Sequence, residues 1–344
     1  MSERCCHSLI GGFVVLFLAA PAALQSGEYP DESVREALLC SQTLLFNDHF
    51  AQADSVLSDQ ITVNPHDPSA YLFRAGALFA EMTDREENLH EPLFKQLLNT
   101  VDTLTLSVLD TCDSSTAAWM YLFRGHARAY RALWESKFGS SVRAMKLGLS
   151  TIDEYQAGLR RDSTVLDVYA GIGSYHYWKS ARAGLLRWLF IFKNEKAKGI
   201  AELRLAADSS LLHRDIARSA LIWVYLDHKD YGSAVALAED FVRKYPEGKT
   251  FHWPMAQARF KQGQYAEAAV VFERLRSFFD TAPGNYFNLV ECDYHLARCY
   301  SWMEDHDRLR ETLTRFKTYS DLVPRSTQQR QSARLNYLRK MVAR

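Results

Sequence analysis

Three side chains in the last sixth of the chain have the types and the spacing of metal ligands. Cys292, His295 and Cys299 stand at i, i+3 and i+7, which places them on one face of a helix. His295 and Cys299 could hold one metal ion together, but a closed zinc site needs four ligands and we find no partner motif. We therefore expect no metal here, because cysteine and histidine are ordinary contents of packed helices.

The sequence also lacks the common catalytic motifs. It contains no Gly-x-Ser-x-Gly, no glycine-rich phosphate loop and no His-Glu-x-x-His. Gly171 and Gly173 fall inside a helical pattern, which argues against a dinucleotide-binding turn. We predict a protein that is not an enzyme and that uses no cofactor. An enzyme built on Cys292, His295 and Cys299 is the last of the alternatives.

A row of arginines has the chemistry needed to bind carboxylates. In the helix predicted from Trp119 to Trp134, one stripe is apolar and consists of Phe123, Ala127, Tyr130 and Trp134. The adjacent stripe consists of Arg124, Arg128 and Arg131. On the concave face of a helical repeat, these guanidinium groups would bind a partner's carboxylates through paired hydrogen bonds. The alternative, which we favour, is a solvated face that is paired with local Asp and Glu.

The stretch from Ala220 to Leu275 repeats itself at an interval of 34 residues. The matching pairs are Tyr231 and Tyr265, Ala234 and Ala268, and Ala238 and Phe272. In the first copy of the repeat, Pro246 ends the second helix because proline lacks the N–H group. This repeat pattern resembles the tetratricopeptide repeat, in which two antiparallel helices form a unit that stacks on its neighbours. Arg259 departs from it, since it stands where Tyr225 stands in the first copy.

This resemblance implies which residues face a partner. Counted along the first helix of each unit, the concave side holds Ser219, Trp223, Leu226 and Asp227, and then Trp253, Gln257, Phe260 and Lys261. Tryptophan and arginine most often dominate the energetics of interfaces. Our candidate partner-binding residues are therefore Arg124, Arg128, Arg131, Trp223, Asp227, Trp253, Gln257 and Lys261. The alternative is that both tryptophans pack against the neighbouring unit.

Residues 1–22 have the features of a signal peptide. Arg4 is basic, an apolar run extends from Leu9 to Ala20, and small residues follow up to Ala22. The run is too short to cross a bilayer, for which about 20 residues are needed. We expect cleavage near Ala22 and a location in the periplasm or cell envelope, and an uncleaved anchor is the alternative.

The stretch from 168 to 203 interrupts the repeats. A Gly-rich helix, a Leu-Leu-aromatic run and a Gly-apolar helix follow one another, and this order resembles the eukaryotic tetratricopeptide-repeat family of the mitochondrial outer membrane and inclusion clearance. We predict an irregular insert at 178–198, in which the apolar run Leu185–Phe192 is buried. The alternative is a peripheral membrane component for envelope assembly that docks through 185–192, because basic residues flank this run.

The rest of the composition agrees with helices throughout. The 344 residues include only 16 glycines and 9 prolines, and a formal net charge of 0 gives no electrostatic case for binding nucleic acid. Leu335, Leu338 and Val342 share one face and predict a capping helix over about 326–343. We predict an all-α fold in which 23–344 forms one tetratricopeptide-like solenoid of roughly sixteen helices. Its expected function is that of an exported, non-catalytic scaffold that binds a protein or peptide on the concave face.

Overall fold

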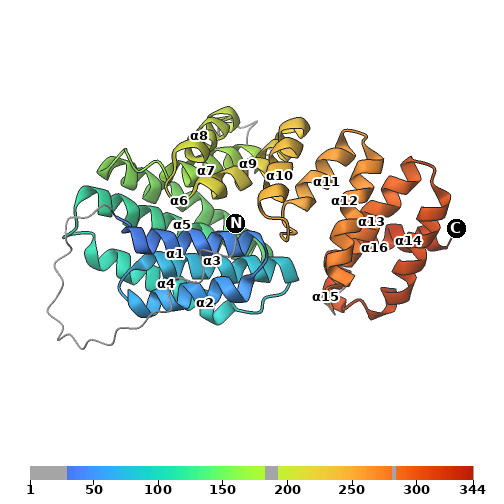
Figure 1. Cartoon of the computed structure of the whole chain (residues 1–344), viewed down its shortest axis with the longest axis horizontal. Helices are drawn as coiled ribbons and strands as arrows, with labels where there is room; N and C mark the ends of the chain where they lie inside the picture. The colour runs from blue at the N-terminus through green and yellow to red at the C-terminus, as the bar shows by residue number, and fades with distance from the viewer. Residues whose placement is uncertain (1–28, 183–192, 281–283, 344) are drawn as a thin grey trace. The chain divides into compact units, whose positions relative to one another are not determined.

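The computed structural model describes residues 29–182, 193–280 and 284–343, and within these ranges every regular element is helical (Figure 1). The all-α prediction is thus confirmed, with sixteen α-helices in the described part of the chain. The helices group into two compact units, and the prediction that 23–344 forms one continuous solenoid stays a prediction. The first unit holds 29–45, 49–80, 90–182 and 193–214, and the second holds 46–48, 81–89, 215–280 and 284–343.

The first unit contains helices α1 to α8, although the last residues of α1 and α3 belong to the second unit. Their bounds are α1 (Glu32–Phe46), α2 (Phe50–Val63), α3 (Pro68–Arg85), α4 (Glu91–Val108), α5 (Ser114–Phe138), α6 (Ser141–Arg161), α7 (Val168–Arg182) and α8 (Lys196–Ser209). The longest are α5 and α6, with 25 and 21 residues, and they pack along each other. Asp113 caps α5 by accepting a hydrogen bond from the Thr116 backbone N–H at 2.9 Å.

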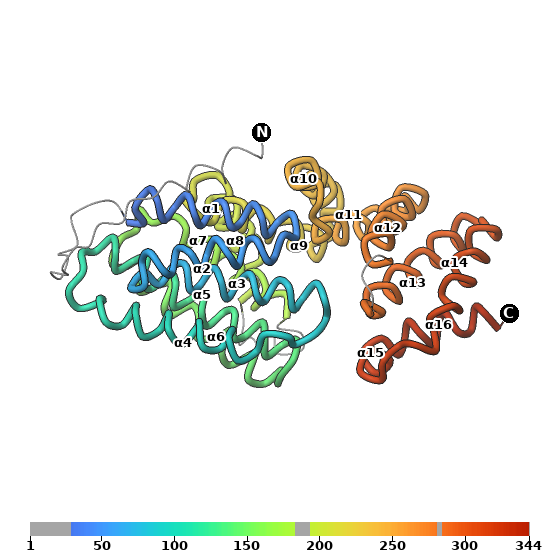
Figure 2. Tube along the Cα trace, turned by 60° about the horizontal axis from the view of Figure 1, so that its bottom comes forward, coloured from blue at the N-terminus to red at the C-terminus, as the bar shows by residue number. Residues whose placement is uncertain are grey.

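Glycines allow α7 and α8 to pack backbone against backbone, side by side in both views (Figures 1 and 2). A Cβ atom on Gly173 would lie 2.8 Å from the carbonyl oxygen of Gly199, and one on Gly199 would lie 2.6 Å from that of Gly173. Glycine is needed at such a close approach because it has no Cβ. Gly125 of α5 and Gly171 of α7 likewise leave room for the ring of Tyr155.

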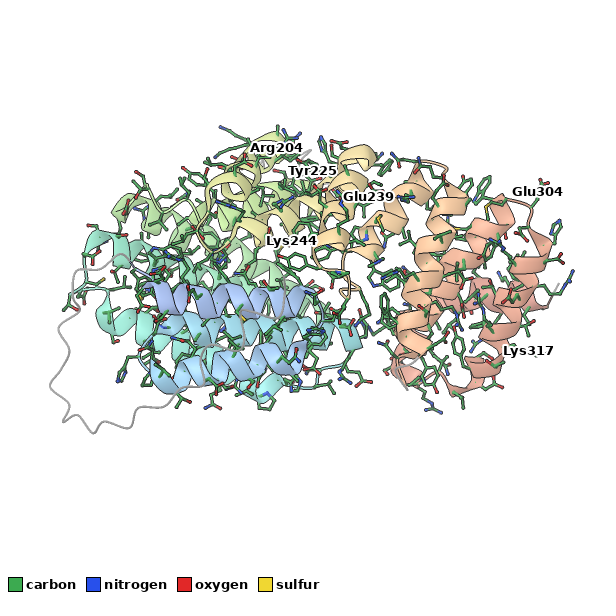
Figure 3. All side chains as sticks on the ribbon, in the orientation of Figure 1. Arg204, Tyr225, Glu239, Lys244, Glu304 and Lys317 are labelled. Carbon is green, nitrogen blue, oxygen red and sulfur yellow. The ribbon has the colours of Figure 1, made fainter. Side chains whose placement is uncertain are left out.

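The second unit contains the repeat pattern. It is built from α9 (Arg214–His228), α10 (Tyr231–Lys244), α11 (His252–Lys261), α12 (Tyr265–Asp280), α13 (Tyr286–Trp302), α14 (His306–Tyr319), α15 (Arg325–Arg330) and α16 (Ser332–Val342), with the 3-10 turn Ser320–Leu322 after α14. Tyr231 and Tyr265 begin α10 and α12, and Ala234 and Ala268 are fully buried. Figure 3 places the side chains on these helices, with Tyr225 labelled on α9 and Glu239 on α10.

The C-terminal residues form two helices where the sequence suggested one. The helix expected over about 326–343 is divided at Gln331 into α15 and α16. Gln331 is buried, and its Nε2 donates to Glu291 Oε2 at 2.8 Å. Leu335 and Leu338 are buried where α16 packs on α13 and α14, as a capping helix requires.

Candidate functional site

The arginine stripe on α5 is engaged by carboxylates of the same unit. Nη2 atoms of Arg124 and Arg128 lie 3.0 and 2.5 Å from Oε1 of Glu154 on α6. Nη2 of Arg131 lies 2.8 Å from Asp102 Oδ2 on α4. Ion pairs of this kind are what the alternative of a face paired with local Asp and Glu predicts. They connect α5 to α6 and to α4. A partner's carboxylate would have to compete with them, so partner binding at this stripe stays a prediction.

The three residues with metal-ligand spacing do not converge on a site. Cys292 and Cys299 are fully buried, and burial raises the pKa of the Cys292 thiol well above its usual value and that of Cys299 to about 12. The thiolate form that binds metal or attacks a substrate is therefore disfavoured. The ring of His295 stacks on Phe272 at 4.6 Å, and its Nε2 lies 3.2 Å from Glu291 Oε1. Across the described ranges, no group of three His, Cys, Asp or Glu residues could hold a metal ion.

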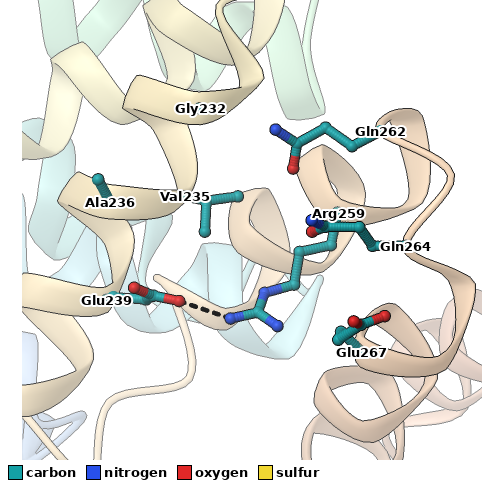
Figure 4. A pocket seen from close by; sticks show the side chains of 8 residues that line it. All are labelled: Gly232, Val235, Ala236, Glu239, Arg259, Gln262, Gln264 and Glu267. Atoms are coloured by element: carbon teal, nitrogen blue, oxygen red, sulfur yellow. Dashed lines mark hydrogen bonds and ion pairs between the residues drawn. The ribbon is translucent and has the colours of Figure 1, made fainter.

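A pocket of about 280 Å³ lies in the second unit, in the middle of the repeat pattern (Figure 4). Its lining comes from α10 and from the end of α11 to the start of α12 and consists of Gly232, Val235, Ala236, Glu239, Arg259, Gln262, Gln264 and Glu267. Arg259 Nη2 donates to Glu239 Oε1 at 2.5 Å, and Glu267 lies on the other side of the guanidinium. None of the eight lining residues is a Ser, Cys or His, the usual groups of nucleophilic catalysis.

The five other candidate residues lie on α9 and α11, and their exposure differs. Asp227 and Lys261 are exposed, whereas Trp223, Trp253 and Gln257 are half-buried. Trp253 lies 6.0 Å from the ring of Phe279 and 6.4 Å from that of Phe272, so it packs on the core of its own unit. Phe260, which the sequence pattern also placed on the partner-facing side, is 8% exposed. Their role in binding a partner is not tested by these contacts and stays a prediction.

Comparison with known proteins finds a family match over most of α9 and all of α11. Residues 219–285 match the tetratricopeptide repeat. The match extends from α9 to the residue before α13 and includes the pocket and all five of these candidates. The predicted repeat is therefore confirmed over these residues, and the resemblance of 168–203 to the eukaryotic mitochondrial family stays a prediction.

Among solved structures, 17 chains match. One is the C-terminal part of a TPR repeat-containing protein from Cytophaga hutchinsonii, with 18% sequence identity, a TM-score of 0.40, and coverage of 84% of this chain and 97% of the other. No curated protein matches the chain.

A buried charge that we did not predict lies one repeat interval beyond Arg259. Asp293 follows Arg259 at the same interval that separates Arg259 from Tyr225, so the three occupy one repeat position. Asp293 is fully buried, and its carboxylate accepts hydrogen bonds from Arg276 Nε at 2.6 Å and from the Tyr319 hydroxyl at 2.7 Å. At this position Arg259 and Asp293 each form an ion pair with the preceding second helix, α10 or α12. Continuing the repeat by one more interval beyond Arg259 would have revealed it.

Two further predictions fall on residues outside the described ranges. The signal peptide at 1–22 and the apolar run at 185–192 both lie there, as do residues 183–192 of the insert at 178–198. Within the residues that are described, none of the helices is long and apolar enough to cross a membrane.

Proposed function

We propose that this protein is a non-catalytic scaffold that binds a protein or peptide partner through the tetratricopeptide repeat at 219–285. The observation that carries the proposal is the match of these residues to the repeat, since such repeats suggest a protein-interaction scaffold. The partner would contact the first helices of the two repeats, α9 and α11. Asp227 and Lys261 are the exposed members of this face, and Trp223, Trp253 and Gln257 are its half-buried members.

Site-specific photo-crosslinking in the native host tests this surface. A photoreactive residue at Asp227 or Lys261 should give a discrete cross-linked species that contains a second protein. The matched control is Val270 on α12, which is 68% exposed and lies on a second helix of the repeat. Equal yields at all three positions, or no discrete species from Asp227 and Lys261, would remove this face from the proposal.

The proposed location is the periplasm or cell envelope, and it is supported by the basic residue, apolar run and small-residue site of residues 1–22. Mass spectrometry of the protein from its native host should find a new N-terminus near Ala22. An intact Met1 on protein from the cytoplasmic fraction would contradict export.

The membrane alternative is supported by the apolar run at 185–192 and its basic flanks. It predicts that the purified protein floats with anionic liposomes and that Trp188→Glu together with Phe190→Glu abolishes flotation. If the run is instead part of the core, the same substitutions should unfold the protein.

A further inference from the structure

Four polar side chains meet in the interior of the first unit, and the repeat at 219–285 does not account for them. They come from α5, from α6, from the turn before α7 and from the turn before α9, and they are His126, Tyr155, Asp167 and His213. Tyr155, Asp167 and His213 are no more than 2% exposed, and His126 is partly exposed. Buried polar groups keep hydrogen-bond partners, so the contacts in this cluster decide which protonation states it tolerates.

Asp167 uses both carboxylate oxygens to hold the turn at 211–213. Its Oδ1 accepts hydrogen bonds from the backbone N–H groups of Leu212 and His213 at 2.7 and 2.8 Å and from His213 Nδ1 at 2.9 Å. Its Oδ2 accepts one from the Leu211 backbone N–H at 2.7 Å. Burial favours the neutral acid, but these hydrogen bonds outweigh it and hold the pKa of Asp167 below its usual value. The carboxylate is therefore charged near neutral pH and fully occupied by this turn.

The two histidines lie against each other. The ring centroids of His126 and His213 are 4.7 Å apart, with the planes at 71°. The Tyr155 hydroxyl lies 3.1 Å from Nδ1 of His126, and the carbonyl of Leu122 is a further hydrogen-bond partner of this ring. Asp167 is the carboxylate that acts on His126, and on the other side His213 faces the ring of Phe73 at 6.0 Å. Burial, and then the neighbouring His213, lower the pKa of His126 well below its usual value, and Asp167 opposes them only in part.

We propose that the His126–His213 pair is an acid-sensitive latch, in which a proton on His126 releases the turn at 211–213 from α5 and loosens the first unit. A cation on His126 would lie in direct contact with His213, and both oxygens of Asp167 are already bonded to the turn. The unfolded chain has no such restriction, because its histidines titrate near pH 6.5. Because His126 is partly exposed, protons from solvent can reach the pair.

The sign of the effect follows from the lowered pKa. Above about pH 6.5 both folded and unfolded chains hold a neutral His126, so its contribution to stability is fully present. As the pH falls below this value toward the folded-state pKa, the unfolded chain binds the extra proton. The unfolding constant of the first unit should then rise about tenfold for each pH unit from this group alone.

Urea denaturation of the full-length protein at pH 7.5, 6.5 and 5.5 tests the latch. His126→Phe keeps an aromatic ring and cannot be protonated. The rise in its unfolding constant between pH 7.5 and 5.5 should therefore be smaller than that of the wild type by about tenfold. The buried His252 of the second unit, whose pKa is also lowered, is present in both proteins and cancels in the comparison. The control His66→Gln changes an exposed histidine and should behave as the wild type. Equal pH dependence in wild type and His126→Phe would overturn the proposal.

Hydrogen exchange on the wild-type protein is a second test, and it does not depend on whether His126→Phe folds. After correction for intrinsic exchange rates, protection of the amides of Leu212 and His213 should fall by about tenfold or more from pH 7.5 to 5.5, in line with the change in the unfolding constant. Amides near Ala268 in α12 should change less. Equal changes in the two regions would contradict a latch in the first unit.

Discussion

The two units bring their helices close together in different ways. In the first unit, Gly173 and Gly199 place the backbones of α7 and α8 in contact, with no room for a Cβ atom. In the second unit, the fully buried Ala234 and Ala268 recur at the repeat interval, and Ala268 belongs to a core that is rich in large aromatic side chains. A side chain added at the glycines would collide with backbone atoms, which cannot move without moving their helix. A larger side chain at the alanines would press on other side chains, which can adjust in part. We therefore expect the first unit to be intolerant of very small changes and the second to be most sensitive at its buried charges and large side chains.

The units also use buried charge differently. In the first unit, Asp167 binds three backbone N–H groups and one histidine, so it fixes a turn. In the second unit, Asp293 and Arg276 pair between α12 and α13 at a position that the repeat can also fill with tyrosine. The first arrangement depends on local backbone geometry. The second places an ion pair at a position where the first copy of the repeat has Tyr225.

The largest expected effect is at the buried ion pair of the second unit. Asp293→Leu leaves Arg276, which is 5% exposed, without its buried partner and should lower the free energy of unfolding by about 3–5 kcal/mol. Asp280, which also pairs with Arg276, should keep the loss near the lower end. Urea denaturation followed by circular dichroism measures it. The double variant Arg276→Met, Asp293→Leu should recover part of the loss, and an equal or larger loss would show that the pair is not what stabilises this contact.

A slightly smaller loss is expected at the half-buried tryptophan of α11. Trp253→Ala removes contacts with Phe272 and Phe279 and should cost about 3 kcal/mol, the lower end of the range for such truncations. Trp302→Ala is the matched control, because Trp302 is 63% exposed and its ring stacks on that of Tyr265 at the surface. Unchanged stability of Trp253→Ala would mean that Trp253 does not stabilise the core and that its side chain is available to a partner.

The close helix contacts should come next. Gly173→Ala in the first unit and Ala268→Leu or Ala234→Leu in the second should each lower the unfolding free energy by about 1–3 kcal/mol, because new atoms are forced between packed helices. Gly232→Ala in α10 is the control for glycine, since its Cβ would meet nothing within 4 Å. It should stabilise the helix by about 0.5–1 kcal/mol. A harmless Gly173→Ala would contradict the difference between the units, and harmless substitutions at both alanines would contradict the repeat pattern.

The smallest expected loss concerns the arginine stripe. Glu154→Gln removes the charge shared by Arg124 and Arg128 but keeps the shape of the side chain, which is 7% exposed. The cost should be about 1–2 kcal/mol, within the range for an unsatisfied buried group. Thermal melts at low and high salt measure it. No loss at either salt concentration would mean that Glu154 does not hold these arginines in place, which would leave them available to a partner.

The sequence allowed the periodic features to be predicted. Repeated aromatic and small residues placed α10 and α12, and Pro246 follows the end of α10 as expected. Features that depend on contacts between distant residues could not be predicted. Glu154 is far along the chain from Arg124, as His213 is from Asp167, and neither separation corresponds to a helical or repeat period. The break at Gln331 likewise depends on Glu291, which lies on another helix.

The most direct test of the central claim is the affinity of a cross-linked partner for the tetratricopeptide repeat face. Lys261→Glu reverses an exposed charge at the end of α11 and should leave stability within about 0.5 kcal/mol of the wild type. If this face binds the partner, isothermal titration calorimetry should give a Kd at least about tenfold higher for Lys261→Glu than for the wild type. The same Kd for both proteins, and also for Asp227→Lys, would contradict partner binding on this face.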